Sequence, residues 1–347
     1  KKAIPKHCFE RSLLKSFGHL FHDLILSGLC LYAATYIGHP SLPERSSYVL
    51  WPTYWVCQGV VSTGLWVLAH ECGHQAFSDY GIVNDTVGLV VHSALMVPYF
   101  SWKISHRNHH ANTGSIENDE VFVPPRRSEF SSKEMIRETP LYSAYLIFLM
   151  LTVGWMPGYL FLNAAGPRKY YNKANSHFNP YSDLYEKEHF WQIVISDIGM
   201  IFFLSLYIWI IYTFGFGAWL SYFFIPYMIV NYHLVLITYM QHTDVYMPHY
   251  DEKEWTWLRG ALCTVDRSFG SVLNYFFHHI TDTHVAHHLF SSMPFYHAEE
   301  ATEHVKKVLG KYYMKDDTPI AVALWRSFRH CKFIEDESHI ALYKKDW

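Results

Sequence analysis

The chain has 347 residues, of which half are apolar, 18% aromatic and only 17% charged, with a formal net charge of −3. This composition is poor in charge for a soluble domain, and a nearly neutral chain lacks the basic character of a nucleic-acid binder. The mean hydropathy of −0.02 averages long charge-free windows against charged, histidine-rich loops, a mosaic typical of a polytopic membrane protein. The six cysteines form no CxxC pair, which argues against a disulfide framework.

Apolar windows of about 20 residues, long enough to cross a membrane, recur along the chain. The sequence predicts spans at about 17–38, 48–69, 190–212 and 217–240, with a tight turn between the last two. Two further apolar windows, at about 87–100 and 142–165, are interrupted by proline or glycine, and we expect both to lie at the membrane interface. The predicted fold is all-α: one membrane domain over residues 1–347, with four transmembrane helices, interfacial helices and a helical cap.

Three histidine clusters stand out among the 24 histidines. In the first, His70-Glu71-Cys72-Gly73-His74, the imidazoles are four residues apart and share one face of a helix. The other two clusters have imidazoles at i, i+3 and i+4; they comprise His106, His109 and His110, and His284, His287 and His288. Eight imidazoles exceed the three protein ligands of a catalytic zinc, so they predict a site for two metal ions. Imidazole suits iron, zinc, copper and nickel alike, so the ligand type leaves the metal open.

Other polar residues lie near these clusters. His242, at the end of the fourth predicted span, is either a ninth ligand or an interfacial histidine. We expect His233, His278 and His279 to be structural or to support the ligands. Five nearby carboxylates either are solvated loop acids or orient imidazole N–H groups; they are Asp79, Asp85, Asp119, Asp244 and Asp282.

The clusters must lie on one side of the membrane if they build one site. The chain must then cross the membrane an even number of times between any two clusters. This condition leaves four of the apolar windows as spans, and we expect the window 142–165 not to cross. The loops on the opposite side, 39–47 and 213–217, contain only Arg45 of the 28 lysines and arginines. By the positive-inside rule, the cluster side is the cytosol. We therefore expect both termini and the metal-site regions, about 70–141 and 241–347, to be cytosolic.

The three clusters, in this order relative to the spans, resemble those of the membrane-bound fatty acyl desaturases. Four further segments are similar to the microsomal oleate Δ12 (omega-6) subgroup: 85–89 (DTVGL), 97–102 (VPYFSW), 119–124 (DEVFVP) and 293–298 (MPFYHA). The resemblance implies an endoplasmic reticulum enzyme that uses O₂ and two iron ions to insert a cis double bond at the Δ12 position of oleoyl chains on phosphatidylcholine. The iron ligands it implies are His70, His74, His106, His109, His110, His284, His287 and His288, with His242 matching a further ligand position.

The resemblance also implies external electron donors. Two electrons per turnover are expected from a separate cytochrome b5 and its NADH-dependent reductase, because the 347 residues contain no His-Pro-Gly-Gly haem-binding motif. Lys344 and Lys345 fit a dilysine retrieval signal for the endoplasmic reticulum, provided that Trp347 is the terminus. The sequence leaves open whether the chain forms a homo-oligomer or a hetero-oligomer with other desaturases.

Several alternatives remain at this point. An omega-3 desaturase, a fatty acyl hydroxylase and an epoxygenase share the same scaffold, although Val285, Ala286 and Ser291 favour Δ12 activity. His70-Glu71-x-x-His74 alone matches a zinc metalloprotease with Glu71 as general base, which leaves six histidines unexplained. A metal-stabilised receptor or transporter and a bis-imidazole haem protein are the remaining classes.

Overall fold

The computed structural model describes residues 1–129 and 139–345. Helices dominate these residues, and the two short strands pair antiparallel, with His249 opposite Ala341. The helices are α1 Leu13–Ala34, α2 Ser47–Gly73, α3 Gly81–Ala94, α4 Tyr99–Asn112, α5 Pro140–Val153, α6 Leu160–Leu162, α7 Phe190–Phe214, α8 Phe216–Trp219, α9 Ile225–His242, α10 Trp257–Ala261, α11 Ser271–Phe276, α12 His284–Leu289, α13 Ala298–Leu309 and α14 Ile320–His330; the strands are β1 His249–Tyr250 and β2 Ile340–Ala341. The predicted all-α class is confirmed.

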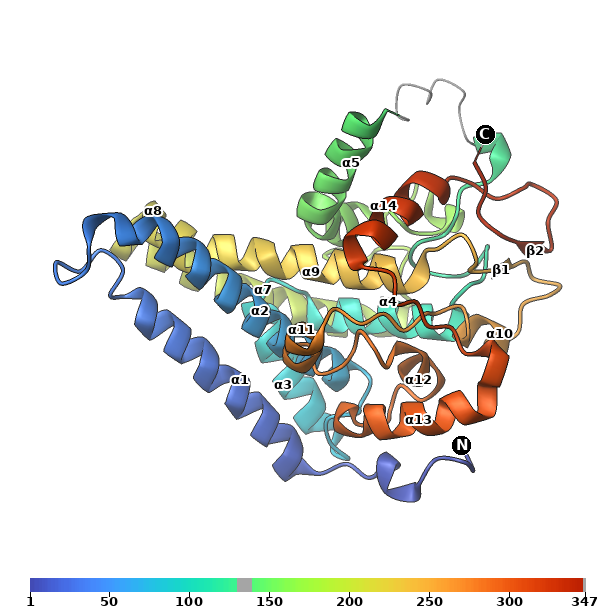
Figure 1. Ribbon diagram of the computed structural model, residues 1–347, viewed down its shortest axis with the longest axis horizontal. Coiled ribbons are helices and arrows are strands. Elements are labelled where there is room, and N and C mark those ends of the chain that lie inside the picture. The colour runs from blue at the N-terminus through green and yellow to red at the C-terminus, as the bar shows by residue number, and fades with distance from the viewer. Residues whose placement is uncertain (130–138, 346–347) are drawn as a thin grey trace.

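Helix α2 is the central element of the bundle, because it packs against α1, α3 and α9 (Figure 1). Its second half is buried almost without interruption from Gln58 to Cys72. The outer helices instead expose apolar side chains, among them Leu24 and Ile25 of α1 and Ile201 of α7. An apolar surface of this kind is stable against lipid and unfavourable in water. The long helices are therefore those of a membrane protein.

Among the described residues, four helical segments are long and apolar enough to cross a membrane: Leu13–Ala34, Pro140–Leu162, Lys187–Phe214 and Phe216–His242. Three of them correspond to the predicted spans 17–38, 190–212 and 217–240. The predicted span 48–69 lies in α2, which has 27 residues but carries Pro52 and several polar residues that lower its hydropathy. The polar residues of its second half, from Gln58 onward, are tolerated because neighbouring helices rather than lipid surround them, whereas its first half exposes Tyr48 and Val49.

The segment 142–165 is not one continuous helix. Helix α5 ends at Val153, and a wide π turn over Gly154–Tyr159 contains Met156 in an extended conformation, with φ −126° and ψ 117°. In Figure 1 α5 rises steeply away from α9. Its length and composition would allow the segment to cross. Its placement at the membrane interface stays a prediction.

Two tight connections lie at the end of the bundle far from the three histidine clusters. Helix α7 ends at Phe214, and Gly215, with φ +86°, turns the chain into α8, as the predicted hairpin requires. The α1–α2 connection lies beside it: the Tyr222 hydroxyl donates to the Ala34 carbonyl at 3.3 Å, and the Trp55 indole N–H to the Ser221 carbonyl at 2.9 Å. Both loops predicted for the opposite side of the membrane therefore share one end (Figure 1).

The window 87–100, predicted as one interfacial segment, contains a sharp corner. It spans the end of α3, a turn and the start of α4, and the two helices are bent by 108°. Pro98 directly precedes α4, a position that tolerates proline because the first turn of a helix does not need its missing N–H. The corner is tightly packed, since a Cβ atom at Gly88 would lie 2.2 Å from the Tyr99 ring. The bend directs α4 back along the end of α2.

A buried ionic network joins the end of α9 to the C-terminal part of the chain. Arg267, which is fully buried, contacts Asp244, reaches Asp316 Oδ2 at 2.6 Å and donates to the Met240 carbonyl at 2.7 Å. Arg326 of α14 contacts the same two carboxylates, at 2.6 Å and 2.5 Å. Two positive and two negative groups thus compensate one another, as buried charges must. The hypothesis that Asp244 orients an imidazole is wrong, because its carboxylate is paired with Arg267 and Arg326.

Candidate metal centre

Four helices carry the clustered histidines and His242 to one place. The last turn of α2 holds His70, and His74 follows directly after Gly73 with helical φ. Helix α4 carries the second cluster, the six-residue α12 carries the third, and α9 ends on His242. The prediction that each cluster presents one helical face is therefore confirmed.

The first group of imidazoles contains His70, His74, His106, His110 and His287, whose ligand atoms all lie within 4.8 Å of one another. The His70 Nε2 atom is 2.9 Å from that of His106 and 3.2 Å from that of His74, and the Nε2 atoms of His106 and His110 are 3.2 Å apart. Two nitrogens bound at about 2.1 Å to one ion lie roughly 3.0–3.4 Å apart at angles of about 90–109°. The first group therefore has the spacing of ligands around a single ion.

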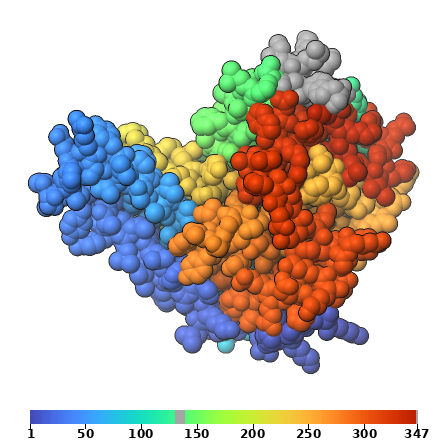
Figure 2. Space-filling view, in the orientation of Figure 1, coloured from blue at the N-terminus to red at the C-terminus, as the bar shows by residue number. Residues whose placement is uncertain are grey.

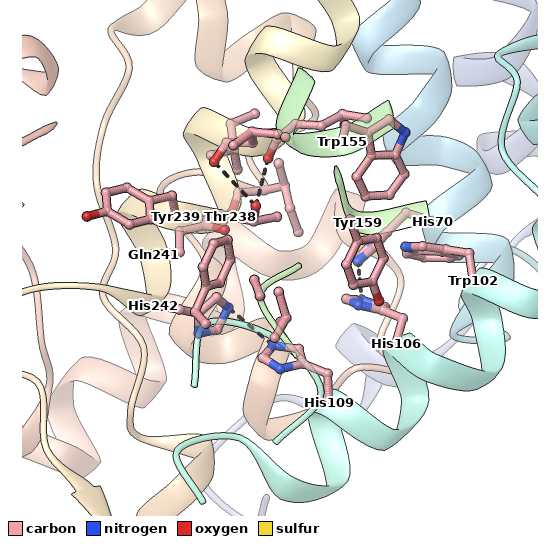
Figure 3. A pocket seen from close by; sticks show the side chains of 18 of the residues that line it. His70, Trp102, His106, His109, Trp155, Tyr159, Thr238, Tyr239, Gln241 and His242 are labelled. Carbon is pink, nitrogen blue, oxygen red and sulfur yellow. Dashed lines mark hydrogen bonds between the residues drawn. The ribbon is translucent and has the colours of Figure 1, made fainter. Parts of the chain in front are cut away.

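The second group contains His109, His242 and His288. The Nε2 atoms of His109 and His242 are 3.4 Å apart, and that of His284 is 3.0 Å from that of His242, so His284 belongs here as well. The rings of His110 and His288 stack at 4.0 Å and connect the two groups. Figure 3 shows the His70–His106 and His109–His242 pairs side by side. All nine predicted histidines are thus brought together.

Two buried carboxylates hold imidazoles from behind. Asp119 Oδ1 lies 2.6 Å from His109 Nδ1, while its Oδ2 accepts the Gly114 N–H at 2.8 Å. Glu71 Oε1 lies 3.1 Å from His70 Nδ1 and 3.7 Å from His287 Nδ1. A carboxylate on Nδ1 fixes the tautomer that leaves the Nε2 lone pair free for a metal. The predicted orienting role is confirmed for Asp119.

The site is built for cations. The Nε2 atoms of His287 and His288 are buried and have no hydrogen-bond partner among the described residues. Burial lowers the pKa of His287 to about 3, and burial together with neighbouring imidazoles lowers the pKa values of His284 and His288 well below the usual range. Neutral imidazoles whose lone pairs converge in a buried space are costly unless a cation accepts those lone pairs. The residues therefore fit two metal ions of the kind that imidazole prefers.

The other singled-out residues lie outside both groups. His233 Nδ1 faces the Thr63 hydroxyl at 3.3 Å, and His278 Nε2 lies 2.7 Å from Asp23 Oδ2. His279 pairs with Asp282 at 3.2 Å. Asp79 pairs with Arg11 and Asp85 with Lys103, so neither contacts an imidazole in these pairs. The three histidines have the structural contacts expected of them.

An apolar cavity of about 370 Å³ opens onto both histidine groups. Its walls include Trp66 of α2, Trp155 of the π turn, and Leu234 and Val235 of α9, and the histidines at its wall are His70, His106, His109, His242 and His284. Figure 3 shows this arrangement, with Trp155 and Thr238 on the side of the cavity away from the imidazoles. Its volume is within the usual range for small-molecule sites, about 300–1,000 Å³. An elongated apolar ligand can therefore approach both groups.

Sequence reasoning missed several residues of this site. Trp155 and Tyr159 come from the segment predicted only as interfacial, and the Tyr159 hydroxyl lies 3.1 Å from the Ser105 hydroxyl. His177 Nε2 is 3.1 Å from the Ser105 hydroxyl, and the Thr113 hydroxyl is 3.3 Å from His288 Nδ1. These polar residues stand alone in the sequence and form no motif. The only signal was the helix break at Gly154–Tyr159.

The fold and the site define a multi-pass helical membrane protein with two adjoining groups of histidines that could hold metal ions and that face an apolar cavity. Residues 48–319 match the sequence model of the fatty acid desaturase family. The chain is 47% identical to the Delta(12) fatty acid desaturase of Mortierella isabellina, over 99% of this chain and 89% of that relative. It is 51% identical to the Delta(12)-acyl-lipid-desaturase of Punica granatum, over 97% and 86%. The omega-6 fatty acid desaturase, endoplasmic reticulum isozyme 1, of Glycine max is 50% identical over the same shares. This chain belongs to the fatty acid desaturase family.

The geometry also excludes two alternatives. Glu71 faces the Nδ1 side of two imidazoles, away from the converging Nε2 atoms, so it is misplaced as general base for a metal-bound water in a protease. Nε2 atoms 2.9–3.4 Å apart leave no space for a porphyrin plane between them, which excludes a bis-imidazole haem. Both results agree with the family.

Proposed function

We propose that this enzyme converts oleoyl chains to linoleoyl chains by inserting a cis double bond at the Δ12 position, with a di-iron centre and O₂. One iron is held by His70, His74, His106, His110 and His287, and the other by His109, His242, His284 and His288. The observation that carries the proposal is the apolar cavity whose wall includes histidines of both groups. The names of the relatives support the Δ12 position.

The residues of the chain have clear tasks in this reaction. Iron, when bound, would activate O₂, so that one hydrogen is removed from each of two adjacent methylene groups of the acyl chain. The overall balance is one O₂, two electrons and two protons consumed, and two waters released for each double bond. Trp66, Trp155 and Leu234 exclude water and hold the methylene chain beside the imidazoles. Asp119 and Glu71 keep the imidazoles oriented.

The substrate, the donors and the location are part of the same proposal. The substrate is oleoyl on phosphatidylcholine, and cytochrome b5 with its NADH-dependent reductase supplies the electrons. The protein lies in the endoplasmic reticulum membrane, which the names of two relatives support. The site and both termini face the cytosol, since Arg45 is the only lysine or arginine in the loops predicted for the other side.

The test is gas chromatography of lipids from cells rich in oleate but lacking polyunsaturated chains. The wild type should produce linoleate, and His109→Ala should produce none. A matched control is His304→Ala, which changes a histidine of α13 outside both groups and should retain activity. Omega-3 or hydroxylated products would overturn the Δ12 assignment, and full activity in His109→Ala would overturn the ligand assignment.

A further inference from the structure

A third group of metal-ligating side chains lies outside the two histidine groups, at the start of the chain. It contains His7, Cys8, His297 and Glu300, whose ligand atoms all lie within 4.8 Å of one another. We propose that this group binds one structural zinc ion, which fastens the N-terminal segment to α13. The inference goes beyond the proposed desaturation, because none of these residues lines the cavity.

The geometry of the group supports a single ion. His7 and Cys8 are neighbours in the 3₁₀ turn Lys6–Phe9, while His297 directly precedes α13 and Glu300 lies in the first turn of α13. His7 Nε2 is 3.7 Å from Cys8 Sγ and makes a direct contact of 2.8 Å with Glu300 Oε2, which an ion bound between the two atoms would replace. Sulfur and nitrogen at about 2.3 and 2.1 Å from a tetrahedral zinc ion lie roughly 3.6 Å apart. One thiolate, two imidazoles and one carboxylate are ligand types that structural zinc accepts.

The chemistry of the same residues argues against a nucleophilic cysteine. Cys8 is fully buried, and burial together with the nearby Glu300 raises the pKa of its thiol to about 11. His7 uses the same ring nitrogen toward both Cys8 and Glu300, so its imidazole cannot relay a proton between them. A zinc ion would instead displace the thiol proton and balance the negative charges of the thiolate and the carboxylate.

The position of the group gives the ion a structural consequence. Ile4 and Cys8 pack in a small apolar cluster with Val285 and Ala286 of α12 and with Ala298 of α13. Val285 and Ala286 lie between His284 and His287, two of the proposed iron ligands. Figure 1 places the N-terminal turn below α13, and Figure 2 shows the dark blue N-terminal segment along the orange and red C-terminal part. A zinc ion here would hold the N-terminal segment against the helix of the third cluster.

The experiment uses the purified full chain in lipid nanodiscs, stripped of metal by a chelator and titrated with Co²⁺. A thiolate-to-cobalt charge-transfer band in the near ultraviolet reports a cysteine-bound ion, to which the all-histidine groups contribute nothing. We expect one equivalent of this band in the wild type, displaced by Zn²⁺ and lost in Cys8→Ser. Cys72→Ser should keep the band, because Cys72 belongs to none of the three groups.

Absence of the band in the wild type overturns the proposal, as does its persistence in Cys8→Ser. Glu300→Gln and Glu303→Gln are a matched pair for the case in which Cys8→Ser does not fold, since both residues lie on the exposed side of α13. Glu300→Gln should weaken cobalt binding at least tenfold relative to Glu303→Gln, and equal affinities would overturn the proposal. The readout is independent of desaturation, so its failure leaves the proposed function untouched.

Discussion

At the scale of single residues, one carboxylate determines how His109 faces the metal site. Asp119 is buried, and its two oxygens are used separately, one for the His109 ring and one for the Gly114 backbone. This arrangement fixes both the tautomer and the rotation of the imidazole, which a solvated acid would not do. The sequence placed Asp119 among five candidates. Only the fold distinguishes it from Asp79, which pairs with Arg11 at the surface.

We expect Asp119→Asn to lower metal affinity or turnover about 10–100-fold, the usual cost of losing a partner of a metal-bound histidine. An amide accepts the imidazole proton less strongly than a carboxylate and leaves the ligand less basic. Iron per chain and the rate of linoleate formation measure the effect. Asp79→Asn is the control and should leave both unchanged; full iron and full rate in Asp119→Asn would contradict the orienting role.

At the scale of elements, the cavity depends on how three segments face one another. One face of α9 lines the cavity with Leu234, Val235 and Thr238, which are at positions i, i+1 and i+4. His242 lies on the same face one turn further along the helix. Trp66 and His70 repeat the same spacing on α2. The π turn containing Trp155 closes the third side. The sequence showed the apolar windows that contain these segments, whereas the way the three segments meet around the cavity was not visible in it.

A larger side chain in this wall should obstruct the substrate without removing the metal. We expect Val235→Phe to reduce linoleate formation about 10²-fold, since displacing a substrate by about 1 Å has an effect of that size. The iron content should stay at the wild-type value. Val235 lines the cavity, and it is neither a histidine ligand nor one of the carboxylates that hold those ligands at Nδ1. Ile201→Phe, on the exposed face of α7, is the control and should behave as wild type. Unchanged linoleate formation in Val235→Phe would argue against this cavity as the acyl site.

At the scale of the whole molecule, buried neutral histidines outside the metal groups make stability depend on pH. His177 and His249 are both buried, and burial lowers the pKa of each to about 4. In the unfolded chain a histidine has a pKa of about 6.5. Between these two values the unfolded state binds more protons, so stability is complete above about pH 6.5 and decreases as the pH falls toward 4.

We expect each of these two histidines to contribute up to about 3 kcal/mol to this loss, from a shift of roughly two and a half pKa units. The measurement is the thermal denaturation midpoint of the protein in nanodiscs between pH 7 and pH 4.5. His177→Gln should show a shallower decrease than the wild type, whereas His39→Gln, in the α1–α2 connection, should show the same decrease. Parallel curves for the wild type and His177→Gln would contradict the explanation.

The sequence by itself determined the local features of this protein. Apolar windows identify the long helices because hydrophobic transfer acts on composition, and the i, i+3 and i+4 spacings place each histidine cluster on one face because helical periodicity is a property of the backbone. Eight imidazoles on three faces were enough to predict two metal ions.

Only the tertiary structure decided which faces meet. His110 and His287 share one group while their neighbours His109 and His288 share the other, because adjacent residues of a helix point in different directions and therefore meet different partner helices. The 108° bend before Tyr99, the pairing of Asp244 with two arginines and the position of Trp155 in the cavity wall are likewise seen only in the folded chain. Such contacts join residues far apart in the chain, and their geometry depends on how every intervening helix packs, which no local pattern records.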